Sequence, residues 1–182
     1  TPSLARMILK KGGSLALPAK WFSLPQCWRY ERMTRGRKRE HYQWNLDIFG
    51  VAGVSAEAEL LAAITTFFGR VGLDHSDIGI KVSSRKVLQG VLDSAGVPAE
   101  SFAAVAVLVD KLEKVPRDAI AEDMAALGLD DGQVDRIIEA LSLRDLDGLE
   151  ALLGADSPAL LELRELFALA ASYGFAAWLV FD

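Results

Sequence analysis

The stretch QCWRYERMTRGRKREHYQWNLDI, residues 26–48, decides the fold because two strand-like segments flank a basic turn. Residues 26–31 are rich in aromatic side chains, and residues 40–50 alternate polar and apolar side chains with period two. Residues 32–38 contain a glycine and predict a loop between the two segments. The simplest arrangement is an antiparallel hairpin with a long, basic connection.

The hairpin predicts one polar face and one aromatic face, since successive side chains of a strand point to opposite sides. If the strands pair their polar sides, one sheet surface carries Arg29, Glu31, His41, Gln43 and Asp47. The opposite side is expected to face the core and to carry Trp28, Tyr30, Tyr42 and Trp44. Asparagine and aspartate are depleted in strands, so Asn45 and Asp47 indicate a use for the polar face. An ordinary solvent-exposed face is the alternative.

Charge is unevenly distributed along the 182 residues, whose net charge is −5. Residues 1–50 hold ten Lys and Arg against three Asp and Glu, a balance of +7, so the remainder carries −12. Six of these cations fall within residues 29–43, a self-repelling group that relaxes when an anion binds. Guanidinium groups match phosphate oxygens and stack on aromatic bases, so a nucleotide is the favoured anion. A nucleic-acid backbone is the alternative, and it predicts exposed aromatic side chains among the cations.

After the hairpin the apolar period becomes helical. The pattern predicts a helix opened by Ser55, a short strand over residues 78–82 and a helix opened by Ser84. Residues 97–175 form a run of short apolar stripes separated by glycines, which predicts an all-helical module without a fixed repeat. Residues 176–182 are expected to return to the sheet. The fold class is therefore α+β, with an inserted all-helical module.

Cysteine count and hydropathy bear on the compartment. The single cysteine, Cys27, permits no internal disulfide and no cysteine cluster for a metal, which predicts a reducing compartment and no metal site. No apolar run reaches the roughly 18 residues that a membrane-spanning helix needs, so no membrane association is expected. We expect a cytoplasmic protein, or a chloroplast or mitochondrial one if a transit peptide precedes Thr1.

A start without Met and an end directly after an apolar run indicate a fragment of a longer protein.

Residues 29–31, Arg-Tyr-Glu, and residues 36–43, Gly-Arg-Lys-Arg-Glu-His-Tyr-Gln, resemble the second signature motif of the class II aminoacyl-tRNA synthetases. Residues 55–60, 80–88 and 109–114 are similar to segments of the histidyl-tRNA synthetase family in particular. The Arg-x-Glu pattern alone is weakly specific, but its spacing to the later segments makes the resemblance fairly specific. The resemblance covers nearly the whole chain.

The resemblance implies a division of the chain into three parts. Residues 1–96 would be part of the class II catalytic core, an antiparallel sheet with flanking helices, with the signature motif at 26–48. Residues 97–175 would be a helical insertion that contacts the tRNA acceptor arm in relatives, and a merely structural module is the alternative. Residues 176–182 would be a strand that returns to the core.

The resemblance also implies a reaction, in which ATP and histidine give histidyl-adenylate and the histidyl group passes to its tRNA. Magnesium would accompany the ATP, and the full-length parent would be a homodimer. By motif position Arg29, the expected catalytic residue, would contact the α-phosphate and the histidine carboxylate. Glu31 would accept a hydrogen bond from the adenine amino group, and Arg37 and Arg39 would hold the outer phosphates. His41 would stack on adenine, where many bacterial relatives have phenylalanine.

The histidine pocket would be lined by Thr1, Arg29, Gln43 and Asp47, where an acceptor such as Asp47 suits the ring donor and the ammonium group. The alternative function is a non-catalytic paralogue that binds histidine, of the kind that regulates ATP phosphoribosyltransferase. Retention of the loop arginines favours the ligase. The third class motif and the anticodon-binding domain are not in this sequence, so the fragment alone is expected to be inactive.

Overall fold

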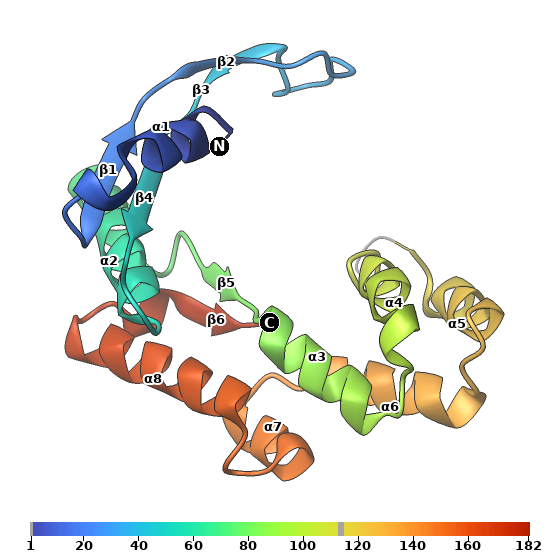
Figure 1. Cartoon of the computed structure of the whole chain (residues 1–182). Coiled ribbons are helices and arrows are strands. Elements are labelled where there is room, and N and C mark those ends of the chain that lie inside the picture. The colour runs from blue at the N-terminus through green and yellow to red at the C-terminus, as the bar shows by residue number, and fades with distance from the viewer. Residues whose placement is uncertain (1, 113–114) are drawn as a thin grey trace. The chain divides into compact units, whose positions relative to one another are not determined.

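The computed structural model describes residues 2–112 and 115–182, and the chain divides into two compact units. The first unit ends at Leu60 and the second runs from Leu61 to Asp182. Helix α2, Ser55–Arg70, carries the chain from one unit to the other (Figure 1).

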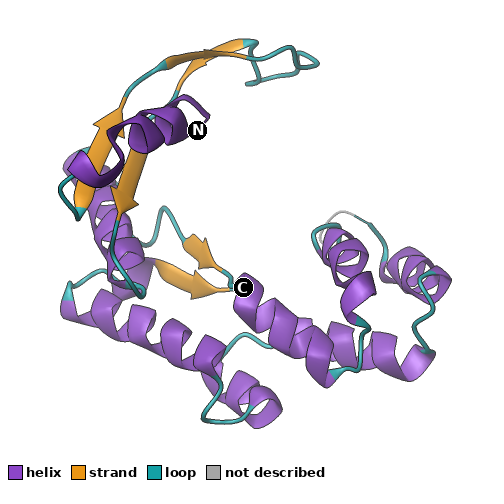
Figure 2. Ribbon diagram, viewed as in Figure 1, coloured by secondary structure: helices purple, strands orange, loops and turns teal. Residues whose placement is uncertain are grey.

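The first unit is built from antiparallel strand pairs and a short helix (Figure 2). Its elements are α1 Pro2–Lys11, η1 Gly12–Ser14, β1 Ala19–Ser23, β2 Gln26–Trp28, β3 Glu40–Tyr42 and β4 Asn45–Phe49. Strand β1 pairs antiparallel with β4, and β2 pairs antiparallel with β3. The predicted hairpin with a long basic connection is therefore confirmed. Its loop, residues 29–39, joins β2 to β3.

The prediction of one continuous strand over residues 40–50 is wrong, because Gln43 and Trp44 separate β3 from β4. Pro25 lies opposite this break, and the Gln43 backbone N–H donates to the Pro25 carbonyl at 3.1 Å. Proline has no N–H to return to the ladder, so the pairing cannot run through this position. The result is two separate two-stranded sheets, and β2 with β3 forms a free-standing ribbon.

The expectation that the aromatic side of the hairpin faces a core is also wrong. The exposed fractions of Trp28, Tyr30 and Tyr42 are 69%, 89% and 73%, and that of Trp44 is 42%. Among the described residues, the three clusters of buried hydrophobic side chains all belong to the second unit. A two-stranded ribbon has no layer of its own to cover either face, so its aromatic side chains stay accessible.

The second unit is mostly helical, with one small parallel sheet. Its elements after α2 are β5 Ile80–Val82, α3 Arg85–Ser94, η2 Ala99–Ser101, α4 Phe102–Val109, α5 Arg117–Ala126, α6 Asp131–Leu141, α7 Leu146–Leu153, α8 Pro158–Ser172, η3 Ala176–Trp178 and β6 Leu179–Phe181. The predicted strand at the end of the chain exists as β6. It pairs in parallel with β5, so this sheet does not extend the antiparallel pairs of the first unit.

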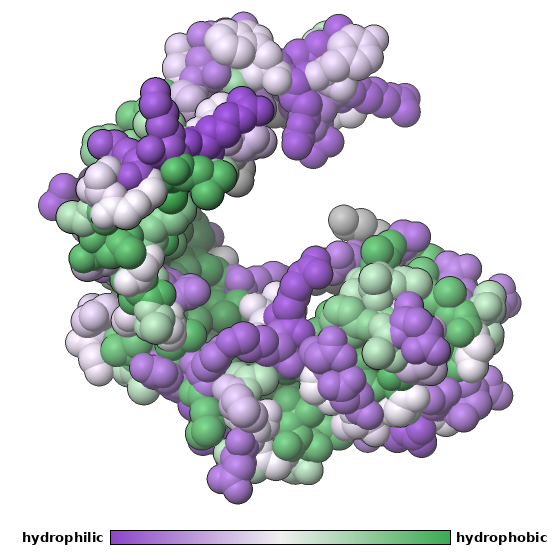
Figure 3. Space-filling view, viewed as in Figure 1, coloured by the Kyte–Doolittle hydropathy of each residue, from purple (hydrophilic) through white to green (hydrophobic). Residues whose placement is uncertain are grey.

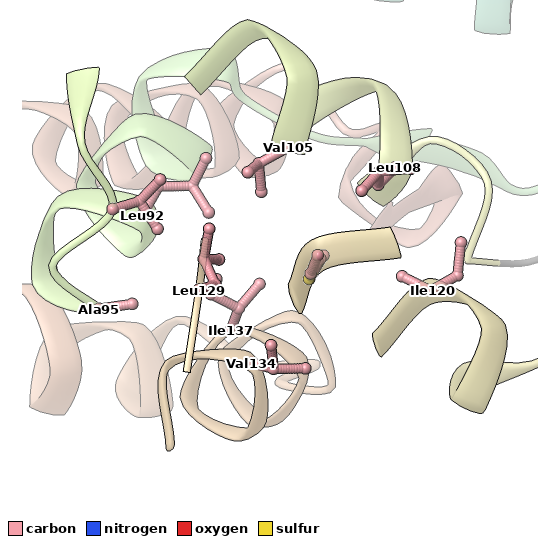
Figure 4. Packing of buried hydrophobic residues seen from close by; sticks show 10 residues of the cluster. Leu92, Ala95, Val105, Leu108, Ile120, Leu129, Val134 and Ile137 are labelled. Atoms are coloured by element: carbon pink, nitrogen blue, oxygen red, sulfur yellow. The ribbon is translucent and has the colours of Figure 1, made fainter. Parts of the chain in front are cut away.

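Helix α3 is shared between two hydrophobic clusters of the second unit. Leu92 on one of its sides, together with Ala95 directly after its end, belongs to a cluster with side chains of α4, α5 and α6 (Figure 4). The other side contributes Val87 and Val91 to a cluster with α7 and α8. Helix α3 therefore packs with the helical region that follows it. The boundary at residue 96 between the expected catalytic core and the helical insertion stays a prediction.

Local signals at the helix starts agree with the sequence. The Ser84 side chain caps α3 by accepting from the Val87 backbone N–H, and Asp130 forms a capping box with Gln133 at α6. In the turn after α2, hydrogen bonds from the Ser76 side chain and backbone hold the pKa of the Asp74 carboxyl below its usual value. Across residues 2–112 and 115–182, no helix is both long and apolar enough to cross a membrane.

Candidate functional site

The polar face of the β2–β3 ribbon carries several of the predicted site residues. Cys27 pairs with His41 in the antiparallel register, and the Arg29 backbone N–H donates to the Arg39 carbonyl at 2.8 Å. The ladder therefore continues past the assigned ends of both strands. Because alternate residues share a face, Arg29, Arg39 and His41 lie on the same side of the ribbon.

The tip of the basic loop is a tight turn. The Arg37 backbone N–H donates to the Thr34 carbonyl at 3.0 Å, and Gly36 between them has a φ of 80°. A glycine adopts this left-handed conformation without steric cost, which makes Gly36 the residue that permits the turn. The turn folds Arg37 back toward the ribbon. Strongly hydrophilic residues gather over this tip (Figure 3).

Glu31 holds two of the arginines by its carboxylate. One carboxylate oxygen accepts a hydrogen bond from Arg29 Nη1 at 2.9 Å, and the other forms an ion pair with Arg37, 3.2 Å from its Nε. The Glu31 side chain is 22% exposed, whereas those of Arg29 and Arg37 are 73% and 65% exposed. The anion that these two arginines contact in this structure is thus a residue of their own loop.

Arg39 is held by different groups. Its Nε donates to the Glu31 backbone carbonyl at 3.2 Å, and its guanidinium carbon lies 4.3 Å from the centre of the Tyr30 ring. This distance is that of a cation–π contact. Arg29, Arg37 and Arg39 therefore all contact the single residue Glu31. We call these three residues the arginine set.

The predicted histidine-binding residues are only partly brought together. The backbone N–H of Gln43 is bound to Pro25, and the Cys27 thiol donates to Gln43 Oε1 at 3.4 Å. Asp47 lies in the other sheet, on β4, where its register partner is Trp21. Thr1 lies outside the described residues, as do residues 113 and 114 at the end of the segment 109–114.

Sequence reasoning missed the roles of Tyr30 and Cys27 as partners of predicted site residues. Tyr30 was assigned to the core-facing side, yet its ring contacts Arg39. An aromatic residue placed between an arginine and a glutamate in a cation-rich loop is the signal that could have suggested this contact. No comparable signal pointed to the hydrogen bond between Cys27 and Gln43, because it depends on the hairpin register.

No group of three or more His, Cys, Asp or Glu side chains in the described part of the chain could hold a metal ion. The site is instead cationic, with its arginines more than half exposed at Arg29 and Arg37. Its chemistry is that of an anion site, because guanidinium groups bind phosphate or carboxylate oxygens through paired hydrogen bonds.

Comparison with solved structures identifies the fold. A histidyl-tRNA synthetase from Nostoc sp. PCC 7120 superposes with a TM-score of 0.83 at 21% sequence identity, covering 98% of this chain and 43% of that one. A Bacillus halodurans protein described as an ATP phosphoribosyltransferase regulatory subunit/histidyl-tRNA synthetase superposes with a TM-score of 0.81 at 20% identity. It covers the whole of this chain and 47% of that one. The chain therefore has the fold of the corresponding parts of these two solved structures.

Sequence relatives narrow the class to one family. The family model described as histidyl-tRNA synthetase matches residues 1–124. The chloroplastic/mitochondrial histidine–tRNA ligase of Arabidopsis thaliana is 50% identical over all 182 residues, which correspond to 37% of that relative. The histidine–tRNA ligase of Halobacterium salinarum is 40% identical over 156 residues, 86% of this chain and 36% of the relative. The chain belongs to the histidyl-tRNA synthetase family, and it spans a little over a third of the length of these relatives.

Proposed function

We propose that the whole protein is a histidine–tRNA ligase, and that the β2–β3 ribbon of this chain binds its ATP. The observation that carries the proposal is the arginine set, in which three guanidinium groups contact one residue, Glu31. Three cations gathered in this way suit a polyphosphate, which carries several charged oxygens over a short distance. Family membership supports the assignment of that polyphosphate as ATP.

In the proposed reaction the histidine carboxylate attacks the α-phosphorus of ATP. A carboxylate oxygen forms the new bond to phosphorus, and the bond to the bridging oxygen breaks as pyrophosphate leaves. Two anions must approach each other, so a cation between them lowers the barrier. Arg29 is proposed to contact both, whereas Arg37 and Arg39 are proposed to hold the outer phosphates. Magnesium is expected to enter with ATP and to share the charge of those phosphates.

The remaining site assignments are proposals of the same kind. Glu31 is proposed to accept from the adenine amino group, and His41 is proposed to stack on adenine. Gln43, Asp47 and Thr1 are proposed to contact histidine. Because Gln43 Oε1 already accepts from the Cys27 thiol, its amide nitrogen is the group left to donate to a ligand.

The exposed aromatic side chains of the ribbon bear on the nucleic-acid alternative. Trp28, Tyr30 and Tyr42 are exposed beside the cations, as single-stranded nucleic-acid binding would require. For a member of this family a nucleic acid is not a rival ligand, because the proposed second substrate is a tRNA.

The relatives' names also lead us to propose an organellar or cytoplasmic location, with chloroplasts or mitochondria favoured by the Arabidopsis relative. A homodimer is proposed for the full-length protein.

Pyrophosphate exchange tests the proposed function. The full-length protein is expected to exchange labelled pyrophosphate into ATP only when histidine and magnesium are present, because the adenylate must form before the reaction can reverse. Each of the other amino acids serves as a control. Exchange that responds to another amino acid would contradict the histidine assignment. Histidine binding without any exchange would support the regulatory paralogue instead.

A second prediction concerns the contact between Tyr30 and Arg39. We expect Tyr30→Leu to raise the KM for ATP about threefold, because an exposed cation–π contact contributes roughly 0.5–1 kcal/mol. The KM for histidine should stay the same, since the Tyr30 ring contacts Arg39, a cation assigned to the outer phosphates. Tyr30→Phe keeps the aromatic ring, so its KM for ATP should match that of the wild-type protein. Equal rises in both constants would instead indicate a general disturbance of the loop.

A further inference from the structure

We propose that the solvent-facing side of helix α1 binds the phosphate backbone of a tRNA. The proposal rests on the proposed function, because that function supplies a tRNA as the second substrate. Its starting point is the charge of residues 1–30, which hold five Lys and Arg and no Asp or Glu. Three of these five cations, Arg6, Lys10 and Lys11, lie in α1, and all three are exposed.

The geometry of α1 separates a side that faces the protein from a side that faces solvent. Leu4 and Ile8, which lie one turn apart, are half-buried, and the other residues of α1 are exposed. Arg6 and Lys10 also lie one turn apart. Because each residue of an α-helix advances by about 100° around the axis, these two cations project from the side opposite Leu4 and Ile8. Both charges are therefore presented to solvent from a single face.

The charges of α1 are not neutralised by carboxylates in the described part of the chain. None of Arg6, Lys10 and Lys11 forms an ion pair with a residue of 2–112 or 115–182, whereas the Lys20 ammonium lies 2.7 Å from the Glu59 carboxylate. Like charges at positions i and i+4 repel each other, so Arg6 and Lys10 destabilise the helix that carries them. The helix dipole offsets this only for cations in the last turn, to which Arg6 does not belong. An anion bound across both side chains would remove the repulsion.

A phosphate backbone suits this surface because the first unit as a whole is cationic. Residues 1–60 hold ten Lys and Arg against five Asp and Glu, a balance of +5, whereas residues 61–182 hold ten against twenty, a balance of −10. Arg29, Arg37 and Arg39 of the β2–β3 ribbon are assigned to ATP in the proposed function. Helix α1 is thus a cationic surface outside the proposed ATP site. Contacts from Lys and Arg to phosphates add affinity for RNA without reading its sequence.

An anionic membrane surface is the other polyanion that a basic helix fits, and α1 does expose Met7 and Leu9, by 54% and 79%. A helix that lies on a membrane buries one continuous apolar face in the lipid. Met7 and Leu9 are two residues apart, so they project to different sides of α1. Leu4 and Ile8 are turned toward the protein. Helix α1 therefore presents separate apolar side chains rather than a continuous face, and RNA is the favoured partner.

Binding of histidine-specific tRNA to the full-length protein, measured over a range of salt concentrations, tests the inference. Arg6→Gln combined with Lys10→Gln is expected to raise the Kd for tRNA about tenfold at physiological ionic strength, because each lost phosphate contact costs a factor of a few. The slope of log Kd against log salt concentration should fall by about two, one for each contact. Glutamine is nearly as good a helix former as arginine and lysine, so α1 should persist. Pyrophosphate exchange, which precedes the transfer to tRNA, should keep its rate.

Arg70→Gln is the matched control for Lys10→Gln, because both remove one exposed cation from the last turn of a helix. Lys10→Gln should raise the Kd for tRNA about threefold, whereas Arg70→Gln should leave it unchanged. Lysine acetylation of the full-length protein, followed by mass spectrometry, adds a structural readout. Lys10 and Lys11 should react when the protein is free and become protected when tRNA is bound.

A double variant that exchanges pyrophosphate and binds tRNA like the wild type would overturn the inference alone, as would lysines of α1 that stay unreactive in the free protein. A loss of tRNA binding matched by an equal loss of exchange would also overturn it, because that result marks a general disturbance of the fold. Weaker binding to phosphatidylserine vesicles with unchanged tRNA binding would assign α1 to a membrane surface instead. A wild-type protein without histidine-dependent exchange would overturn the proposed function, and the inference with it.

Discussion

Arg29→Ala is expected to lower the rate of histidine-dependent pyrophosphate exchange by about 100-fold or more, the scale seen when one group that stabilises developing charge is removed. Arg29 is the member of the arginine set assigned to the reacting phosphate and to the histidine carboxylate. Its side chain is 73% exposed, so it is open to a ligand from solvent. Loss of this cation leaves the two reacting anions without a shared partner, and the effect should fall mainly on kcat.

The substitution should leave the ribbon itself intact. Arg29 holds the ladder through its backbone N–H, which donates to the Arg39 carbonyl and which alanine retains. Glu31 also keeps its ion pair with Arg37 in this variant. The loss of activity can therefore be assigned to the guanidinium group rather than to unfolding of the loop.

Arg70→Ala is the matched control, because it removes an exposed arginine from the end of α2, away from the ribbon sequence. Its exchange rate should stay close to that of the wild type. Arg29→Lys adds a second comparison, since lysine keeps the charge but lacks the planar pair of donors. We expect an intermediate rate for Arg29→Lys. A full rate for Arg29→Ala would contradict the role assigned to this residue.

The hairpin was predictable because its signals are local. Period-two alternation on both sides of a glycine-containing basic loop identifies two strands and the turn between them. Parity then placed Arg29, Arg39 and His41 on one face, and the register of β2 and β3 confirms this arrangement. The break after Tyr42 also has its cause in the sequence, at Pro25, the residue opposite Gln43. Pro25 lacks the backbone N–H that the Gln43 carbonyl would need as its donor.

Burial of the aromatic side chains was not predictable from parity alone. Alternation shows which residues share a face but not whether another layer covers that face. Trp28 and Tyr42 do share a side of the ribbon, as predicted, yet both are mostly exposed. The ion pairs of Glu31 could not be predicted either. The family resemblance implies a ligand contact for its carboxylate and says nothing of its partners in the absence of a ligand.

The packing of α3 shows a similar limit in the second unit. Its apolar residues predicted a helix with a buried side, and Ser84 marked its start. The sequence did not show that Val91 and Leu92, which are neighbours in the chain, would enter two different clusters. Which helix packs on each side of α3 depends on helices that lie far from it in the sequence. Local propensity does not contain that information.

Leu160→Ala is expected to have the largest effect on stability among the substitutions considered, lowering the free energy of local unfolding by about 3 kcal/mol. Leu160 is fully buried and lies in the cluster that joins α8 to α3 and α7. Truncation leaves a cavity that close-packed neighbours fill only in part. Helix propensity does not add to the cost, because alanine is the better helix former.

Hydrogen exchange followed by mass spectrometry on the full-length protein measures this effect locally, without assuming that the whole protein unfolds in one step. Peptides from α8, α7 and α3 should lose protection roughly 100-fold in Leu160→Ala, as a 3 kcal/mol loss implies. Leu161→Ala is the matched control, since Leu161 is the next residue of the same helix and is 52% exposed. It should cost less than about 1 kcal/mol, as surface substitutions do. Equal losses from both variants would mean that α8 does not bury Leu160 against α3 and α7, because only burial distinguishes the two leucines.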